Sequence, residues 1–304
     1  MNVLRSLKKD AIRNKYVYFM AFPVLAYYIL FHYLPMGGLV MAFQDYSLVR
    51  GVSGSTFVGF DNFISFFTNF QFPRLIRNTL TISVAEIIFG FPAPIILALL
   101  INEVRGKFFK RTVQTISYMP HFISLVVISG IILNFTSSDG VIMQLYTMIT
   151  GNPGFSMLMR PNLFLPVYVI SGIWMHVGWG SIIYLAAISS VDPGLYESAA
   201  IDGAGRFRRI WSITLPSILP TISILLIMRA GSIMSVGFER VFLLYNPTIF
   251  ETADVISTFV YRRGIIGFEY GFSAAVGMFN SVINFVILIS VNAISGKFTG
   301  NRLW

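Results

Sequence analysis

The chain has 304 residues, of which 55% are apolar and 12% are charged, and its formal net charge is +9. Its mean hydropathy of +0.73 is too high for a soluble domain of this length and indicates a membrane protein. The sequence contains no cysteine, which excludes disulfides, iron–sulfur clusters and thiolate chemistry.

Long stretches without Asp, Glu, Lys or Arg predict the membrane-spanning helices. Four of them cover residues 16–44, 112–138, 161–191 and 270–296, each longer than the ~20 residues that an α-helix needs to cross the bilayer core. Two further stretches, 78–101 and 215–238, contain one charge each, Glu86 and Arg229. We therefore expect an all-α membrane protein with six transmembrane helices. The first stretch is too long for a signal peptide and is expected to remain as an uncleaved helix.

The positions of the basic residues predict the orientation of the chain. Lysines and arginines concentrate in residues 5–15, 105–111, 206–209 and 297–302, which the positive-inside rule places in the cytoplasm together with both termini. Residues 1–15 are expected to lie on the anionic inner leaflet, in contact with membrane lipid. No basic patch lies outside these flanks, so a nucleic-acid partner is not expected. We expect one domain over residues 1–304.

The loop at 45–77 and the second span carry local signals. Phe63, Phe66, Phe67 and Phe70 have the spacing of an amphipathic helix, which Asp61 beside Asn62 would cap. This stripe is more typical of packing than of ligand stacking.

In the second span, Pro92 and Pro94 remove backbone donors and predict a kink, which serves either as a hinge or for packing. Small residues in the later spans, among them Gly172, Gly178 and Gly231, permit close helix approach.

The two charges inside predicted spans lie at similar depths. Glu86 is about eight residues, or ~12 Å, from the outer edge of its helix, and Arg229 is ~9 Å from that side in a ~30 Å core. We predict that Glu86 and Arg229 form a pair. The alternative is that Arg229 faces a wet cavity and binds a carboxylate of the ligand.

A polar insert at 192–214 interrupts the apolar sequence. Asp192 precedes a proline and ends the fourth span, and residues 195–202 are expected to form a short helix that exposes Glu197. Gly203 and Gly205 turn the chain, and a second short helix from Arg206 leads back into the membrane. The insert thus predicts a helix–turn–helix along the inner surface.

The spacing within this insert resembles the coupling motif of importer permeases in the ATP-binding cassette superfamily, E-A-A-x3-G-x9-I-x-L-P. Glu197, Gly203 and the Ile213 to Pro216 segment are in register, and Ser198 replaces the first alanine. Segments 57–63, 77–80, 114–122 and 236–247 resemble the carbohydrate-uptake branch, which is maltose-permease-like. Within it they look like permeases for complex oligosaccharides and pectin fragments (polygalacturonan or rhamnogalacturonan). The likeness covers nearly the whole chain.

The resemblance implies a type I importer permease in a bacterial cell membrane. It implies a heterodimer with a second permease, two ATPase subunits, an extracellular solute-binding protein and an oligosaccharide substrate. A substrate derived from pectin would contain uronate groups and would therefore be acidic. ATP and Mg would be used by the partners, with no cofactor, metal or catalytic residue on this chain. Consistently, the sequence has no G-x4-G-K-[S/T] loop. The residues implied in coupling to the ATPase are Tyr196, Glu197, Ala199, Ala200, Asp202, Gly203 and Ala204.

Aromatic and hydrogen-bonding side chains in the later spans are candidates for the substrate path. Each has an ordinary alternative, since tryptophan anchors helices at the membrane interface and a histidine can be satisfied within a bundle. The candidates are Trp174, His176, Trp179, Arg229, Phe238, Glu239, Arg240, Asn280 and Asn284.

The residues alone leave three alternative functions open. The same machinery could carry neutral oligosaccharides. An ion-coupled secondary transporter would account for Glu86 and Arg229 but not for the cytoplasmic insert. An intramembrane enzyme would need converging catalytic groups, whereas His32, His121 and His176 fall on three different spans.

Overall fold

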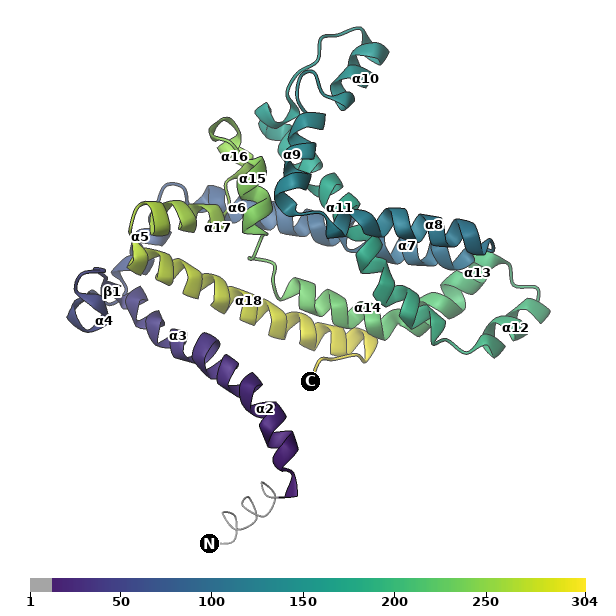
Figure 1. Ribbon diagram of the computed structural model, residues 1–304, viewed down its shortest axis with the longest axis horizontal. Coiled ribbons are helices and arrows are strands. Elements are labelled where there is room, and N and C mark those ends of the chain that lie inside the picture. The colour runs from purple at the N-terminus through teal and green to yellow at the C-terminus, as the bar shows by residue number, and fades with distance from the viewer. Residues whose placement is uncertain (1–12) are drawn as a thin grey trace. The chain divides into compact units, whose positions relative to one another are not determined.

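The computed structural model describes residues 13–304, and these are largely helical (Figure 1). The chain divides into two compact units. Unit 1 consists of the segment up to Thr68 with Arg263–Met278, and unit 2 of Asn69–Arg262 with Phe279–Trp304. Most of the basic segment 1–15 lies outside the described residues, and the single domain predicted for 1–304 stays a prediction.

Within residues 13–304, five helices are long and apolar enough to cross a membrane: Lys15–Phe43, Phe72–Glu103, Pro161–Ser189, Arg206–Ala230 and Tyr270–Lys297. A sixth candidate span is formed by two helices, Lys107–Phe122 and Leu125–Phe135, which are long and apolar enough only together and are bent by 103°. The sequence predicted an unbroken helix over 112–138, which is wrong at this bend. Pro120 lacks a backbone donor, and the Ser124 hydroxyl accepts a bond from the Val127 amide at 3.4 Å, so a new helix starts there.

Unit 1 contains the first span and, after it, two short strands and two short helices. The span runs through α2 (Lys15–Tyr28), η1 (Ile29–Tyr33), α3 (Leu34–Met36) and η2 (Gly37–Phe43). Strands β1 (Gln44–Asp45) and β2 (Thr56–Phe57) then pair antiparallel, with α4 (Gly51–Gly54) between them, and α5 (Asp61–Phe67) follows.

One amide side chain ties α5 to the end of the first span. Asn62 Nδ2 donates to the carbonyls of Ala42 and Gln44, at 3.0 Å each. The predicted cap at Asp61 is wrong, because Phe60 occupies the N-cap position and no side chain caps the helix. Phe66 is buried edge-on against Phe272, so this part of the predicted stripe packs within unit 1.

Unit 2 holds the other spans and the segments that join them. The second span is α6 (Phe72–Ala85), η3 (Glu86–Gly90) and α7 (Pro92–Glu103), and the bent third span is α8 (Lys107–Tyr118), η4 (Met119–Phe122) and α9 (Leu125–Phe135). After α10 (Val141–Thr150) and η5 (Met157–Met159) comes the long α11 (Pro161–Ser189). The remaining elements are α12 (Pro193–Ile201), α13 (Arg206–Arg209), η6 (Ile210–Thr214), α14 (Leu215–Ala230), α15 (Phe238–Leu244), η7 (Pro247–Ile249), α16 (Phe250–Ala253), α17 (Ile256–Val260), η8 (Tyr261–Ile266), which ends in unit 1, and α18 (Tyr270–Thr299), which starts there.

Prolines in two spans are accommodated by widened turns. The π-type turn η3 ends at Gly90, two positions before Pro92, and η6 ends at Thr214, two positions before Pro216. Widening a turn changes which carbonyl each amide reaches, so the missing donor of proline need not break the helix. As a result the predicted short helix from Arg206 does not stop at Pro216 but continues to Ala230 as one span.

Helix α11 packs along α7 and α8 through glycines, as the sequence predicted (Figure 1). A Cβ on Gly178 would collide with the backbone carbonyl of Ser117 in α8, and a Cβ on Gly180 would lie 3.0 Å from Pro94 of α7. The backbones of these helices therefore touch directly.

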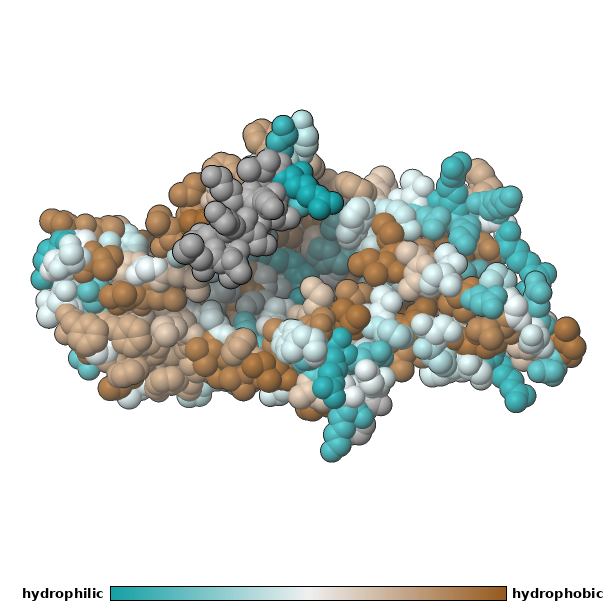
Figure 2. Space-filling model, turned by 90° about the horizontal axis from the view of Figure 1, so that it is seen from below, coloured by the Kyte–Doolittle hydropathy of each residue, from teal (hydrophilic) through white to brown (hydrophobic). Residues whose placement is uncertain are grey.

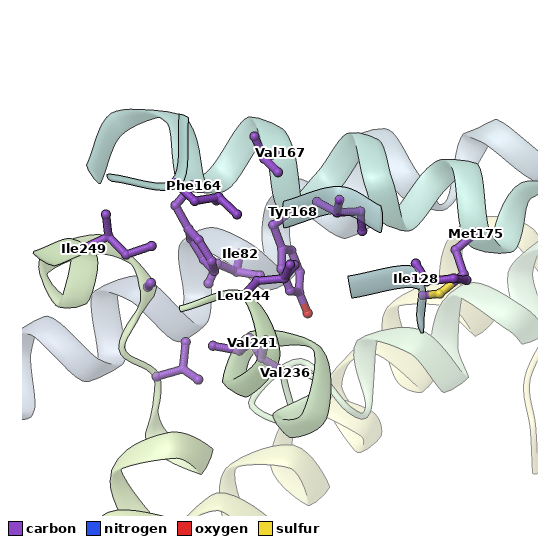
Figure 3. Packing of buried hydrophobic residues seen from close by; sticks show 14 residues of the cluster. Ile82, Ile128, Phe164, Val167, Tyr168, Met175, Val236, Val241, Leu244 and Ile249 are labelled. Atoms are coloured by element: carbon purple, nitrogen blue, oxygen red, sulfur yellow. The ribbon is translucent and has the colours of Figure 1, made fainter. Parts of the chain in front are cut away.

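The apolar core of unit 2 surrounds the first half of α11. Phe164 and Tyr168 project into a cluster with Ile82 of α6, Leu244 of α15 and Ile249 (Figure 3). The cluster joins residues from the second span to the segment after α15, and so fixes the position of α15 against α11.

A buried carboxylate holds the segment that follows this core. Asp254 is fully buried and accepts bonds from Arg262 at 2.6 Å and from Thr258 at 2.8 Å. Burial by itself lowers the pKa of Arg262, but the hydrogen bond and charge of Asp254 outweigh it and the pKa is raised. Asn78 Nδ2 donates to the Asp254 carbonyl at 2.9 Å, which connects this segment to α6.

We expect Gly178→Ala to destabilise the chain by about 1–3 kcal/mol, because the added methyl group meets a backbone carbonyl that cannot rotate away. Thermal unfolding of the purified protein in detergent measures the effect. Gly130→Ala in α9 is the matched control, since nothing lies within 4 Å of its added Cβ and alanine is the better helix former. Equal melting of both variants would contradict the close packing.

Candidate cavity and polar hairpin

Unit 2 contains a cavity of about 890 Å³ between the second span, α11, the end of α14 and the start of α15. Most of its wall is apolar. The charged residues that line it are Glu86, Arg229, Glu239 and Arg240, and other polar lining groups include His121, His176 and Tyr168.

The carboxylate of Glu86 bridges two arginines in this cavity. Arg229 Nη2 donates to its Oε2, which confirms the predicted pair. Arg240 Nη2 donates to its Oε1 at 2.5 Å, a contact that the sequence did not predict. The side chain of Arg229 is 42% exposed, whereas those of Glu86 and Arg240 are 16% and 7% exposed. The pair and the cavity-facing position of Arg229, which were alternatives, therefore coexist.

Arg240 is held from three sides. Its guanidinium carbon lies 3.6 Å from the ring centroid of Tyr168, and its tip fills the space that a Cβ on Gly172 would need. The Tyr168 ring belongs to the apolar cluster, and its hydroxyl points away from Phe164 (Figure 3). Tyr168, Gly172 and His176 are four residues apart on one face of α11, and this spacing is the signal that could have found Tyr168 from the sequence.

The two arginines lie on either side of a non-helical segment. Arg229 is in the last turn of α14, residues 231–237 leave the helix, and Arg240 is in the first turn of α15. Side chains of other helices satisfy the freed backbone: Ser83 donates to the Ile233 carbonyl, and the Met234 amide donates to Asn284 Oδ1 at 2.9 Å. Irregular backbone at membrane depth requires such partners.

The aromatic candidates fall into two groups. Trp179 stacks on His121, with ring centroids 4.6 Å apart and planes inclined by 6°, and His176 lies 5.9 Å from the same histidine. His121, His176, Phe238 and Glu239 line the cavity, whereas Trp179 does not line it and packs behind His121. Trp174, Asn280 and Asn284 are not among the residues that line it, and Asn284 instead bonds to Met234 and Ser235.

The polar insert forms a hairpin of α12 and the start of the fifth span. Asp192 caps α12 by accepting from the Gly194 amide at 2.9 Å, and Gly203 makes the turn at φ +77°, a conformation that favours glycine. The Tyr196 hydroxyl bonds to Thr214 Oγ1 at 3.0 Å, which joins α12 to η6. Ser198, the departure from the motif, bonds to the Gly194 carbonyl within α12.

The residues of this hairpin divide between its two sides. Tyr196, Ala199 and Ala204 are half-buried, whereas Glu197, Ala200, Asp202 and Gly203 are exposed. Three large apolar side chains next to them are exposed as well, namely Ile201 (87%), Phe207 (81%) and Trp211 (69%). Hydrophilic residues also gather at the end of unit 2 that carries α12 and α13 (Figure 2). This end therefore combines charge with uncovered apolar surface.

The spans, the cavity and the hairpin together define a permease of a multi-subunit transporter. Residues 90–300 match the model of the family described as "binding-protein-dependent transport system inner membrane component", and the chain belongs to this family. The predicted all-α type I importer permease fold is thereby confirmed, and the chain is a bacterial inner-membrane permease. The cytoplasmic position of the termini stays a prediction.

Known relatives are similar over almost their whole length. The chain is 46% identical to protein LplB of Bacillus subtilis, covering 96% of this chain and 92% of that protein. It is 42% identical to the polygalacturonan/rhamnogalacturonan transport system permease protein YteP of the same organism, over 94% and 89%. A chain of a bacterial alginate ABC transporter, solved with a periplasmic protein that binds an alginate pentasaccharide, is 46% identical with a TM-score of 0.89, over 97% and 99%.

We expect Arg240→Gln to destabilise the chain by about 3–5 kcal/mol, because it removes a buried charge partner of Glu86 and the stacking on Tyr168. Arg229→Gln is the matched comparison and should lower the free energy of unfolding by less. The side chain of Arg229 is half-exposed, and this substitution leaves the contact between Glu86 and Arg240 in place. Thermal unfolding in detergent gives both values. The reverse order would show that Arg229, and not Arg240, anchors the carboxylate.

Proposed function

We propose that this chain is a translocation subunit of an ATP-driven importer of acidic oligosaccharides that carry uronate groups. One observation carries the substrate class: two arginines, Arg229 and Arg240, line a largely apolar cavity in a chain that is 45% identical to one from an ABC transporter involved in the import of the acidic polysaccharide alginate. Guanidinium groups bind carboxylates through paired, directed hydrogen bonds, which neutral sugars cannot match.

The proposed substrate path follows the cavity lining. Arg229 and Arg240 supply positive charge, Glu239 and His176 supply hydrogen-bonding groups, and Phe238 and His121 supply flat surfaces for sugar rings. Trp179 does not border the cavity and supports the ring of His121 by stacking on it. Trp174, Asn280 and Asn284 are left outside this path, because they do not border the cavity.

The hairpin at 192–214 is proposed to dock on a separate ATPase subunit. Its exposed Ile201, Phe207 and Trp211 would be covered in such a complex, and Glu197 offers a carboxylate to an arginine of the partner. The full importer would contain a second permease, two ATPase subunits that use ATP and Mg, and an extracellular solute-binding protein. The chain itself would bind no nucleotide or metal, in line with the absence of a phosphate-binding loop from its sequence.

Uptake by the complete importer, reconstituted in liposomes with ATP inside, tests the proposed substrate class. Oligogalacturonates should be taken up at least tenfold faster than neutral galactose oligosaccharides of equal length, because only oligogalacturonates carry carboxylates that the arginines can bind. Equal uptake of both would favour the neutral-oligosaccharide alternative. Uptake driven by an ion gradient without ATP would instead indicate a secondary transporter.

We expect Glu197→Ala to lower sugar-stimulated ATPase activity about tenfold, which corresponds to the ~1.4 kcal/mol of one charge-assisted hydrogen bond to the partner. Because Glu197 is exposed, the stability of the isolated chain should change by less than ~0.5 kcal/mol. Asp139→Ala, an exposed acidic residue before α10, is the control and should leave stimulation intact. Equal stimulation in both variants would contradict docking through Glu197.

A further inference from the structure

We propose that Glu86 is the resident counter-ion of the cavity, and that a uronate carboxylate of the passing sugar exchanges with it on Arg229. Arg240 keeps Glu86 in place during the exchange. This inference rests on the proposed function and assigns different roles to the two arginines of one site.

The two arginines differ in their freedom to leave Glu86. Arg240 is 7% exposed, stacks on Tyr168 and lies against Gly172, so its guanidinium has no room for another position. Arg229 is 42% exposed and lines the cavity at the last turn of α14. Each arginine binds its own oxygen of the carboxylate. Arg229 can therefore turn to another carboxylate while Oε1 of Glu86 keeps its partner.

The charges favour exchange over simple addition. The two arginines are balanced by Glu86 and Glu239 among the charged residues that line the cavity. An arginine without a counter-ion at this depth would be costly in the empty state and would hold an anionic sugar too tightly to release it. When a uronate replaces Glu86 on Arg229, Glu86 retains Arg240, so the uronate and Glu86 each have an arginine as partner. When the sugar leaves, Glu86 takes Arg229 back.

A neutral sugar offers nothing that can compete with the carboxylate of Glu86 for Arg229. The exchange therefore selects acidic sugars within the membrane, independently of any selection by a binding protein outside it. This selection resides in Arg229 and Glu86.

Direct binding to the purified permease–ATPase assembly in lipid nanodiscs, without the binding protein, tests this assignment. The probes are trigalacturonate and its methyl ester, which share one backbone and differ in charge. In Arg229→Gln the ratio of affinities for the acid and the ester should fall about tenfold, and Arg229→Lys should recover part of it. Arg160→Gln, which removes an exposed arginine outside the cavity, should keep the wild-type ratio.

Glu86→Gln should change the affinity for trigalacturonate in the opposite direction. Without the resident counter-ion, Arg229 should bind trigalacturonate about fivefold more tightly and release it more slowly, with higher salt weakening the gain. If this variant does not assemble, the ratio in Arg229→Gln still decides, because that variant keeps the buried contact between Glu86 and Arg240.

Two results would overturn the inference alone: an unchanged ratio in Arg229→Gln, or weaker trigalacturonate binding in Glu86→Gln. If the wild-type importer instead shows no preference for acidic sugars in the uptake experiment, the proposed function fails first and the inference fails with it.

Discussion

The arrangement of unit 2 depends on one carboxylate that two arginines share. Glu86 receives Arg229 from the end of α14 and Arg240 from the start of α15, and the chain is not helical between them. A break of this kind exposes backbone groups that lipid cannot satisfy, so the charges, the partner side chains Ser83 and Asn284, and the apolar cluster around Tyr168 have to occur together. The cavity borders this break, and Arg229, Gly237 and Arg240 are among the residues that line it.

The hairpin shows how a polar insert can be rigid without a large core. Asp192 fixes its start, Gly203 its turn, and the bond between Tyr196 and Thr214 its closure. These are local interactions, whereas the apolar side chains of the hairpin remain uncovered. A loop built in this way holds its shape before any partner binds, which reduces the entropy lost in docking.

Much of the fold could be predicted from the sequence because spans, prolines and glycines act locally. The uncharged stretches located the helices, and the depths of Glu86 and Arg229 were sufficient to pair them. Contacts that depend on distant segments could not be predicted. Arg240 lies 154 residues from Glu86, and nothing in the sequence indicated that the two side chains meet. The bend before Ser124 was missed for a different reason, because it interrupts a stretch that carries no charged residue and was therefore read as one helix. Among the candidates for the substrate path, His176, Arg229 and Arg240 line the cavity, while Asn284 supports the backbone. Their contact with substrate stays a prediction.

The fifth span is one continuous helix that joins the hairpin to Arg229 in the cavity. From Arg206 to Ala230 the chain is one helix of 25 residues, about 37 Å long at 1.5 Å per residue. Its first turns belong to the hairpin and its last turn carries Arg229. A pivot of only about 5° at the hairpin moves the far end of such a rod by about 3 Å, which is as long as a hydrogen bond. In the proposed importer, a small tilt of this helix at the hairpin would therefore be enough to separate Arg229 from Glu86.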